Sequence, residues 1–135
     1  MKYLPLLLII GAVIANNCGG NCPGNNCPTC PCGTTKRPED VANVCKGHSW
    51  SQKCCICIVN NESGGNGNAV GYNNNKTYDV GLFQINTVNW QSCNGGSPPC
   101  PMSANLKCAI MVYKWGNNTW KFWATAARCG CANTP

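Results

Sequence analysis

The stretch that decides the fold runs from residue 79 to residue 86 and reads Asp79-Val80-Gly81-Leu82-Phe83-Gln84-Ile85-Asn86. Its first residue is one of only four carboxylates in 135 residues, and Glu62 lies seventeen residues before it. The segment between these two acids is rich in Asn and Gly, a composition suited to turns and to sugar contacts. Glycoside hydrolysis needs two carboxyl groups in contrasting environments, one protonated and one ionised. We therefore take Glu62 and Asp79 as a candidate catalytic pair.

Apolar residues at helical spacing, with matching end signals, predict four helices around this stretch. In the first helix, Val41, Val44 and Cys45 form an i, i+3, i+4 stripe. In the second, residues 56–59 would also fit a strand, because a short apolar run does not distinguish the two. The first helix opens with Pro38-Glu39-Asp40 and stops at Gly47, and the second runs from a cap at Ser49 or Ser51 to Glu62. The third covers residues 104–115, with Ser103 as its cap and Gly116 at its end. The fourth covers residues 119–128.

The residues between the two carboxylates predict a β-hairpin. Its strands are 70–72 and 77–79, and the turn-forming residues 73–76 (Asn-Asn-Asn-Lys) connect them. Such a sheet would hold the second carboxylate rigidly, facing the end of the helix that carries the first. A loop with two prolines follows and carries Cys93 and Cys100. The expected fold class is α+β, mainly helical with a small antiparallel hairpin sheet beside a cleft, and rich in disulfides.

The first fifteen residues predict a secretory signal peptide. Lys2 gives the positive start, residues 4–14 are almost wholly apolar, and Ala15 supplies a small residue for cleavage before Asn16. A retained anchor is the alternative, but a transmembrane helix needs ~20 apolar residues. We expect a secreted protein, or one in a lysosomal or phagosomal lumen, with no stable membrane anchor.

All fourteen cysteines lie beyond that segment. An even count in a secreted chain predicts disulfides rather than free thiols. Zinc binding is the alternative, because Cys27-Pro-Thr-Cys30-Pro-Cys32 has ligand-like spacing. An oxidising compartment favours disulfides, so we expect no metal and no cofactor.

Residues 16–33 form a Cys-rich leader, and residues 34–135 form the predicted catalytic domain. The leader has no apolar side chain apart from cysteine and proline, so disulfides must fix its shape. It is either a small appended module that binds sugar, or a stapled arm that lies on the main domain. The second alternative fits its lack of a core.

The charge of the chain is modestly basic. Without Lys2, nine Lys and Arg side chains stand against four Asp and Glu, a net of +5. A basic secreted protein is attracted to anionic polymers such as bacterial envelopes. No basic run is present, and nothing else in the sequence indicates nucleic-acid binding. We expect a monomer that does not bind nucleic acid.

Several residues from 54 to 129 keep a distinctive set of spacings. They are Cys57 five before Glu62, Glu62-Ser63, Ala69, Asp79, Gly81, Leu82, Gln84-Ile85-Asn86, Trp90, and the twenty-one-residue interval from Cys108 to Cys129. This pattern resembles the c-type lysozymes, the animal peptidoglycan hydrolases. It needs no gap between Cys57 and Asn86, and it covers roughly the middle and C-terminal two-thirds of the mature chain. The Cys-rich leader lies outside it.

The resemblance implies a role for each matching residue. Glu62 matches the general acid, and Asp79 matches the second carboxylate, a nucleophile or charge stabiliser. The implied substrate-binding and supporting residues are Asn73, Thr77, Gln84, Asn86, Trp90, Phe122 and Trp123. The same alignment implies that Cys57 pairs with Cys129, and that Cys108 pairs with Cys93 or Cys100.

Two departures from the family pattern concern aromatic residues. Phe122 falls where a tryptophan normally packs on the acid, and Trp123 is one residue out of register. In lysozymes an apolar, tryptophan-walled pocket raises the pKa of the glutamate. Phe122 would still supply an apolar wall, so we expect a raised pKa for Glu62. Asn89 replaces one of two adjacent sugar-stacking tryptophans, the other being Trp90, which should weaken or alter sugar binding.

The implied activity is a secreted muramidase that cleaves the β-1,4 bond of peptidoglycan with retention, with chitin-like oligosaccharides as the other candidate substrate. Retention predicts carboxyl groups about 5–5.5 Å apart. One alternative is a lysozyme-like protein that holds sugar without cleaving it, which the presence of both carboxylates disfavours. The other is a cationic antimicrobial that disrupts membranes. That function needs a basic amphipathic helix, and residues 119–128 contain only Lys121 and Arg128.

Overall fold

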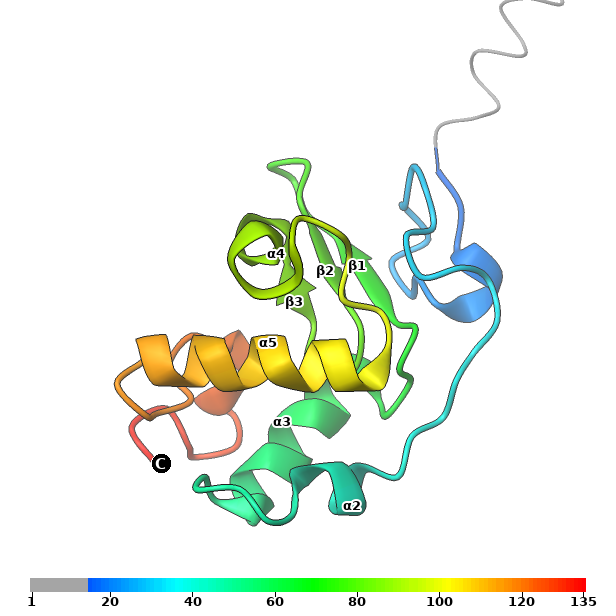
Figure 1. The fold of residues 1–135 in the computed structure, drawn as a ribbon. Helices are drawn as coiled ribbons and strands as arrows, with labels where there is room; N and C mark the ends of the chain where they lie inside the picture. The colour runs from blue at the N-terminus through cyan, green and yellow to red at the C-terminus, as the bar shows by residue number, and fades with distance from the viewer. Residues whose placement is uncertain (1–14) are drawn as a thin grey trace, which may run out of the picture.

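The computed structural model describes residues 15–135, so the predicted signal peptide lies almost wholly outside the described residues. Figure 1 shows the sheet and α4 on one side of α5, with α2 and α3 on the other. This arrangement confirms the predicted α+β class. The elements are η1 (Cys18–Gly20), α2 (Val41–Cys45), α3 (Gln52–Ser63), β1 (Val70–Tyr72), β2 (Tyr78–Val80), β3 (Ile85–Asn86), α4 (Thr87–Asn94), α5 (Met102–Trp115) and η2 (Ala124–Ala126).

Helix α3 carries the first candidate carboxylate and forms as the sequence predicts. Ser51 is its cap, because its hydroxyl accepts a hydrogen bond from the Cys54 amide at 3.1 Å. The helix ends at Gly64, whose φ of 62° is left-handed and free of strain only without a side chain. Residues 56–59 lie within the helix, so the strand alternative is wrong.

Helix α2 is shorter than predicted. Asp40 is its N-cap, with a side chain that accepts from the Asn43 amide at 3.2 Å. Pro38 and Glu39 therefore precede the helix instead of forming its first turn. The Glu39 amide donates to the Gly65 carbonyl at 2.9 Å, which ties the entry of α2 to the exit of α3.

The predicted hairpin is present, and a third strand extends it. β2 lies between β1 and β3, both antiparallel to it, in the order β1-β2-β3. Asp79 pairs with Gly71 on one side and with Asn86 on the other. The second candidate carboxylate is therefore on the central strand, held by backbone pairing from both sides.

A buried asparagine joins this sheet region to α5. The Asn105 side chain is 0% exposed and donates to the carbonyls of Val80 at 2.9 Å and Pro99 at 2.7 Å. Its carbonyl oxygen accepts from the Phe83 amide at 2.7 Å. Gly81, with a φ of +80°, packs directly against this amide, where a Cβ atom would clash. The turn between β2 and β3 is therefore fixed on the helix by polar contacts, all of them satisfied.

Two further helices differ from the prediction. The segment after the sheet, expected as a loop, contains α4, whose N-cap Asn86 accepts from the Val88 amide at 3.1 Å. Helix α5 begins at Met102, after Pro101, and not at Ala104. Ser103 lies in its first turn and does not cap it.

The predicted last helix over 119–128 is wrong. Only the short turn η2 is helical there, and Asn117 and Asn118 before it have φ of 59° and 57°. The reason is tertiary: the rings of Trp120 and Trp123 both enter the core, 5.1 Å apart between centroids. Packing of these large side chains outweighs the modest helix propensity of the segment.

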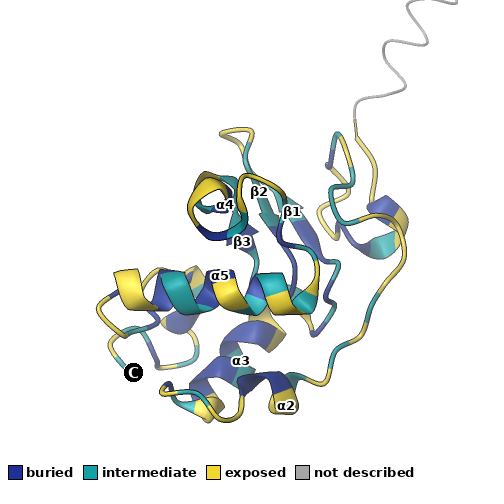
Figure 2. Cartoon of the chain, viewed as in Figure 1, coloured by how far each residue is buried: buried dark blue, intermediate teal, exposed yellow. Residues whose placement is uncertain are grey.

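An aromatic cluster forms the centre of the core. The Trp50 ring lies 5.5 Å from Tyr113, 5.8 Å from Phe83 and 4.8 Å from Trp120, measured between ring centroids. Trp120 itself is 0% exposed. Figure 2 shows the buried residues gathered on the inner faces of α3, α5 and the sheet. The core therefore joins helical and sheet layers into one body.

The leader lies against the outer strand β1, as Figure 1 shows. The Asn21 carbonyl accepts from the Val70 amide at 2.8 Å, and its side-chain oxygen accepts from Asn66 at 2.8 Å. The hydroxyls of Thr29 and Tyr78 lie 2.7 Å apart. These contacts are those of a stapled arm, one of the two alternatives for this segment.

Seven disulfides pair all the cysteines of the chain. Two lie within the leader, and a third joins it to the loop before α5. The bridges are Cys18–Cys30, Cys22–Cys27, Cys32–Cys100, Cys45–Cys55, Cys54–Cys131, Cys57–Cys129 and Cys93–Cys108. The cysteines considered as zinc ligands thus each have a sulfur partner elsewhere. Among residues 15–135, no helix is long and apolar enough to cross a membrane.

Candidate active site

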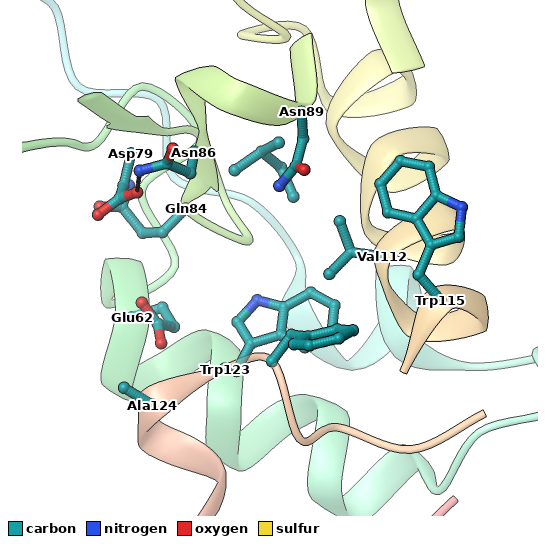
Figure 3. Close-up of a pocket in the computed structure, with 11 residues that line it drawn as sticks. Glu62, Asp79, Gln84, Asn86, Asn89, Val112, Trp115, Trp123 and Ala124 are labelled. Carbon is teal, nitrogen blue, oxygen red and sulfur yellow. Dashed lines mark hydrogen bonds between the residues drawn. The ribbon is translucent and has the colours of Figure 1, made fainter. Parts of the chain in front are cut away.

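A cavity of about 500 Å³ lies between the sheet and α4 on one side and α3, the end of α5 and the C-terminal segment on the other. Figure 3 shows Glu62 and Asp79 facing one another at one end of it. The lining residues are Glu62, Asp79, Gln84, Ile85, Asn86, Asn89, Val112, Trp115, Phe122, Trp123 and Ala124. The folding of the chain thus brings both candidate carboxylates into one hollow.

Glu62 projects into this cavity from the last turn of α3 and is half-buried. Burial is the main cause that raises its pKa above the ordinary value, and the nearby Asp79 charge raises it further. The Thr125 hydroxyl opposes these effects, because it donates a hydrogen bond to Glu62 Oε2 at 2.8 Å. The net result is a raised pKa, which favours the protonated acid.

Asp79 has a different environment, made of amide donors. Asn73 Nδ2 donates to Asp79 Oδ2 at 3.1 Å, and Asn86 Nδ2 donates to Asp79 Oδ1 at 2.8 Å. Both amides also donate to Thr77 Oγ1 at 3.1 Å. One donor on each oxygen fixes the plane of the carboxyl group. Of these supporting residues, Asn86 lines the cavity, whereas Asn73 and Thr77 are not part of its lining.

Gln84 lines the cavity but uses its amide to hold the backbone. Its Nε2 donates to the carbonyls of Ala69 at 3.1 Å and Gly81 at 3.0 Å. Its φ of 53° is unusual for a residue with a side chain, and these two bonds offset that strain. Gln84 therefore stabilises the turn beside Asp79.

The structure corrects the register of the last two predicted aromatic residues. Trp123, and not Phe122, is the packed indole of the cavity wall: it is 6% exposed, and its Nε1 donates to the Phe83 carbonyl at 2.9 Å. Figure 3 places it beside Glu62. Phe122 also lines the cavity but is 58% exposed. The apolar wall of the cavity that contains Glu62 therefore includes a tryptophan.

Trp90, expected to contact sugar, does not line the cavity. Its ring is 9% exposed, and its Nε1 donates to the Ile85 carbonyl at 3.0 Å, so it belongs to the core under α4. Asn89, the residue before it, occupies the cavity wall. In helix α4 adjacent residues point in directions about 100° apart, which is why only one of the two reaches the cavity.

Sequence reasoning missed Thr125, Val112, Trp115 and Ala124. Thr125 gives no signal in the sequence, because its hydroxyl meets Glu62 only across the fold. Trp115 ends the apolar helix α5, yet it is 48% exposed and lines the cavity. The pairings implied for Cys57 with Cys129 and for Cys108 with Cys93 appear in the structure, and Cys100 pairs instead with Cys32 of the leader.

No group of three or more His, Cys, Asp or Glu side chains suited to a metal ion occurs within residues 15–135. Glu62 and Asp79 are the two carboxylates among the residues that line the cavity. A carboxyl group with a raised pKa can act as a proton donor, and a second carboxyl group nearby can attack or stabilise a positively charged carbon.

Comparison with known proteins gives a consistent family. The family described as "Lysozyme like domain" matches residues 44–125. Lysozyme c-1 of Anopheles gambiae is 33% identical over 79 residues, which cover 50% of this chain and 56% of that protein. Lysozyme C of Takifugu rubripes is 36% identical over 56 residues, which cover 42% of this chain and 38% of that protein. The chain thus spans between about a third and a little over half of these relatives' lengths.

Proposed function

This chain belongs to the lysozyme-like domain family, and we propose that it is a secreted muramidase that hydrolyses the β-1,4 glycosidic bonds of bacterial peptidoglycan. The observation that carries the proposal is the pairing of Glu62 and Asp79 in one cavity with contrasting surroundings. One carboxyl group is desolvated and has a raised pKa, whereas the other is held by two amide donors. Two carboxyl groups set apart in this way are the arrangement known from lysozymes themselves.

In the proposed mechanism, Glu62 protonates the glycosidic oxygen as the bond to the sugar C1 breaks. Asp79 attacks C1, or stabilises its positive charge, from the opposite face of the ring. The deprotonated Glu62 then takes a proton from water, which attacks C1 and releases the sugar with its original anomeric configuration. Asn73 and Asn86 keep the Asp79 carboxyl group in the plane needed for attack, and Gln84 holds the turn beside it.

The same proposal extends to the setting of the protein. The basic net charge would draw it to anionic bacterial walls. Seven disulfides suit an oxidising compartment, so we assign it to the extracellular space or to a lysosomal or phagosomal lumen. Residues 16–33 act as an arm on a catalytic domain formed by 34–135, and the protein works as a monomer without nucleic acid or a membrane anchor.

The first test is clearing of a bacterial cell-wall suspension by the oxidised protein, beside Glu62→Gln. We expect clearing by the wild type and a loss of at least about a hundredfold in the variant, because general acid catalysis contributes ~10²–10⁴-fold. Glu39→Gln is the matched control, because it removes the other glutamate, which pairs with Arg37 at 3.0 Å outside the cavity.

Product analysis separates this mechanism from its alternatives. Proton NMR of chitin oligomers during cleavage should show the β-anomer first, as retention requires. A folded wild type that clears no wall and cleaves no oligomer would overturn the enzyme proposal in favour of a sugar-binding protein. Killing of bacteria that survives Glu62→Gln would instead point to membrane disruption.

A further inference from the structure

Two aromatic side chains of the cavity are exposed to solvent, which is unusual for their size. Within residues 15–135, the large hydrophobic side chains that are exposed are Val88 at 72%, Trp115 at 48% and Phe122 at 58%. Of these, Trp115 and Phe122 line the cavity that contains Glu62 and Asp79. Exposed apolar surface at the wall of a cavity indicates a surface that a ligand covers.

The fold brings these two side chains to one cavity through the turn that follows α5. Trp115 is the last residue of α5, and the chain then turns through Asn117 and Asn118 in left-handed conformations. Gly116 is buried, and a side chain there would meet the Phe122 ring at 3.3 Å and the Thr119 carbonyl at 3.0 Å. The Thr119 hydroxyl donates to the Gly116 carbonyl at 2.6 Å, which closes the turn. The Phe122 ring therefore packs over Gly116, the residue that follows Trp115, and both aromatic side chains line the same cavity.

The opposite wall of the cavity is polar at this end. Asn89 of α4 lines it, while the ring of Trp90 is turned into the core. Figure 3 shows Asn89 and Trp115 at the part of the cavity away from Glu62 and Asp79, with Val112 between them and Trp123. A ligand here meets an amide on one side and two aromatic faces on the other. An N-acetylhexosamine ring has this two-sided character, with apolar C–H groups on one face and polar groups at its edge.

We propose that Trp115 and Phe122 form a sugar-stacking platform at the far end of the cavity. The platform lies on the α5 side of the cavity. The α4 side has Asn89 and no aromatic ring. The ligand of the platform is an N-acetylhexosamine unit of the polysaccharide, separated from the bond that is cleaved. The platform makes binding depend on chain length, because only a longer oligomer reaches both it and the carboxylates. This inference rests on the proposed function and assigns part of its substrate recognition.

The test measures binding in the Glu62→Gln background, so that the oligomers stay intact. Dissociation constants are measured by calorimetry for N-acetylglucosamine oligomers of two to six units. We expect Trp115→Ala to weaken the hexamer by about five- to tenfold, since burial of part of a large aromatic ring contributes ~1 kcal/mol or more. The dimer should change little. Trp115→Phe should retain most of the hexamer affinity, and Phe122→Ala should weaken it in the same direction.

Val88→Ala is the matched control, because it removes an exposed apolar side chain outside the cavity and should leave every affinity unchanged. Phe122→Ala also tests the platform independently, should Trp115→Ala fold poorly. An NMR spectrum gives a direct readout: the chain has five tryptophans, and Trp115→Phe identifies the indole signal of Trp115. That signal should shift on addition of the hexamer.

The platform is refuted if the hexamer binds Trp115→Ala and Phe122→Ala as tightly as the parent, or if the Trp115 signal does not shift. It is also refuted if Trp115→Ala leaves the hexamer affinity unchanged but alters the sedimentation coefficient of the protein. That result would mean that a second copy of the chain, and not a sugar, covers Trp115. Wall clearing by the wild type is measured separately. Clearing with an unchanged hexamer affinity overturns the platform alone, whereas failure of both clearing and all oligomer binding overturns the proposed function too.

Discussion

The Thr125 hydroxyl offers a way to change the acidity of Glu62 without altering either carboxylate. It donates to Glu62 Oε2 at 2.8 Å, and this bond lowers the pKa of Glu62 against the raising effect of burial. Thr125→Val keeps the shape of the side chain and removes the donor. Because the lost bond favoured the charged form, we expect the pKa of Glu62 to rise further in the variant.

The size of the change follows from the strength of the bond. A hydrogen bond to a charged group contributes ~1.5–3 kcal/mol, and one pKa unit corresponds to ~1.36 kcal/mol. Glu62 is only half-buried, so water replaces part of the lost donor, and the lower end of the range applies. In our proposed mechanism Glu62 acts as the protonated acid. The alkaline limb of the kcat/KM profile should therefore move up by about one pH unit, while the acidic limb stays in place.

The chain makes this measurement simple, because Glu39 and Glu62 are its only glutamates. Protein labelled with ¹³C at the glutamate carboxyl carbon gives two titrating NMR signals, and Glu62→Gln identifies one of them. Thr134→Val is the matched control, since Thr134 lies near the C-terminus and outside the cavity lining. A Glu62 midpoint in Thr125→Val that is unchanged or lower than in the wild type would refute the reasoning.

Three further predictions concern stability. Glu62→Gln should raise the Tm at neutral pH. The pKa of Glu62 in the folded protein lies above its unfolded value of 4.5. The wild type therefore has its full stability below pH 4.5 and loses part of it as the pH rises through the folded-state pKa, whereas the variant does not. The gain of the variant should vanish near pH 3 in calorimetric scans, and an equal gain at both pH values would contradict this. Asn105→Ala should lower the free energy of unfolding by roughly 3–5 kcal/mol in urea titrations, because it strands three buried backbone groups and leaves a cavity; a loss below about 1 kcal/mol would contradict it. Cys32→Ser with Cys100→Ser should cost about 2–4 kcal/mol in the same titration, because this bridge closes a long loop between the leader and the segment before α5; an unchanged midpoint would show that the leader is held by its other contacts.

Much of the fold could be predicted because local signals and the global fold agree. Helix α3 has a serine cap and a glycine stop, and the hairpin has turn residues between two short strands. Helix α4 was not predicted, because its N-cap, Asn86, is also the last residue of a strand and a donor to Asp79. The sequence therefore contains no separate signal for the start of this helix. The last predicted helix is wrong: Trp120 and Trp123 are both buried, but they are held in an irregular turn and only Ala124–Ala126 form a short helical turn.

The candidate site shows the same division. The sequence by itself determined which residues can act: Glu62 and Asp79 are two of only four carboxylates, and their spacing places one at a helix end and the other on a strand. It also determined the amides around Asp79, because Asn73 and Asn86 lie within a few residues of it along the hairpin.

Only the tertiary structure decided the surroundings of the acid and the shape of the cavity. Thr125 is 63 residues from Glu62 in the sequence but donates a hydrogen bond to it. Trp123, and not Phe122, is the buried aromatic residue of the cavity wall. Trp90 is buried outside the cavity, and Asn89 and Trp115 line it instead. The physical reason is that desolvation and hydrogen bonding depend on distance in space, and side chains far apart in sequence meet only when the core has packed. A one-residue change in register reverses which aromatic ring is buried and which faces the solvent, and no local pattern in this chain fixes that register.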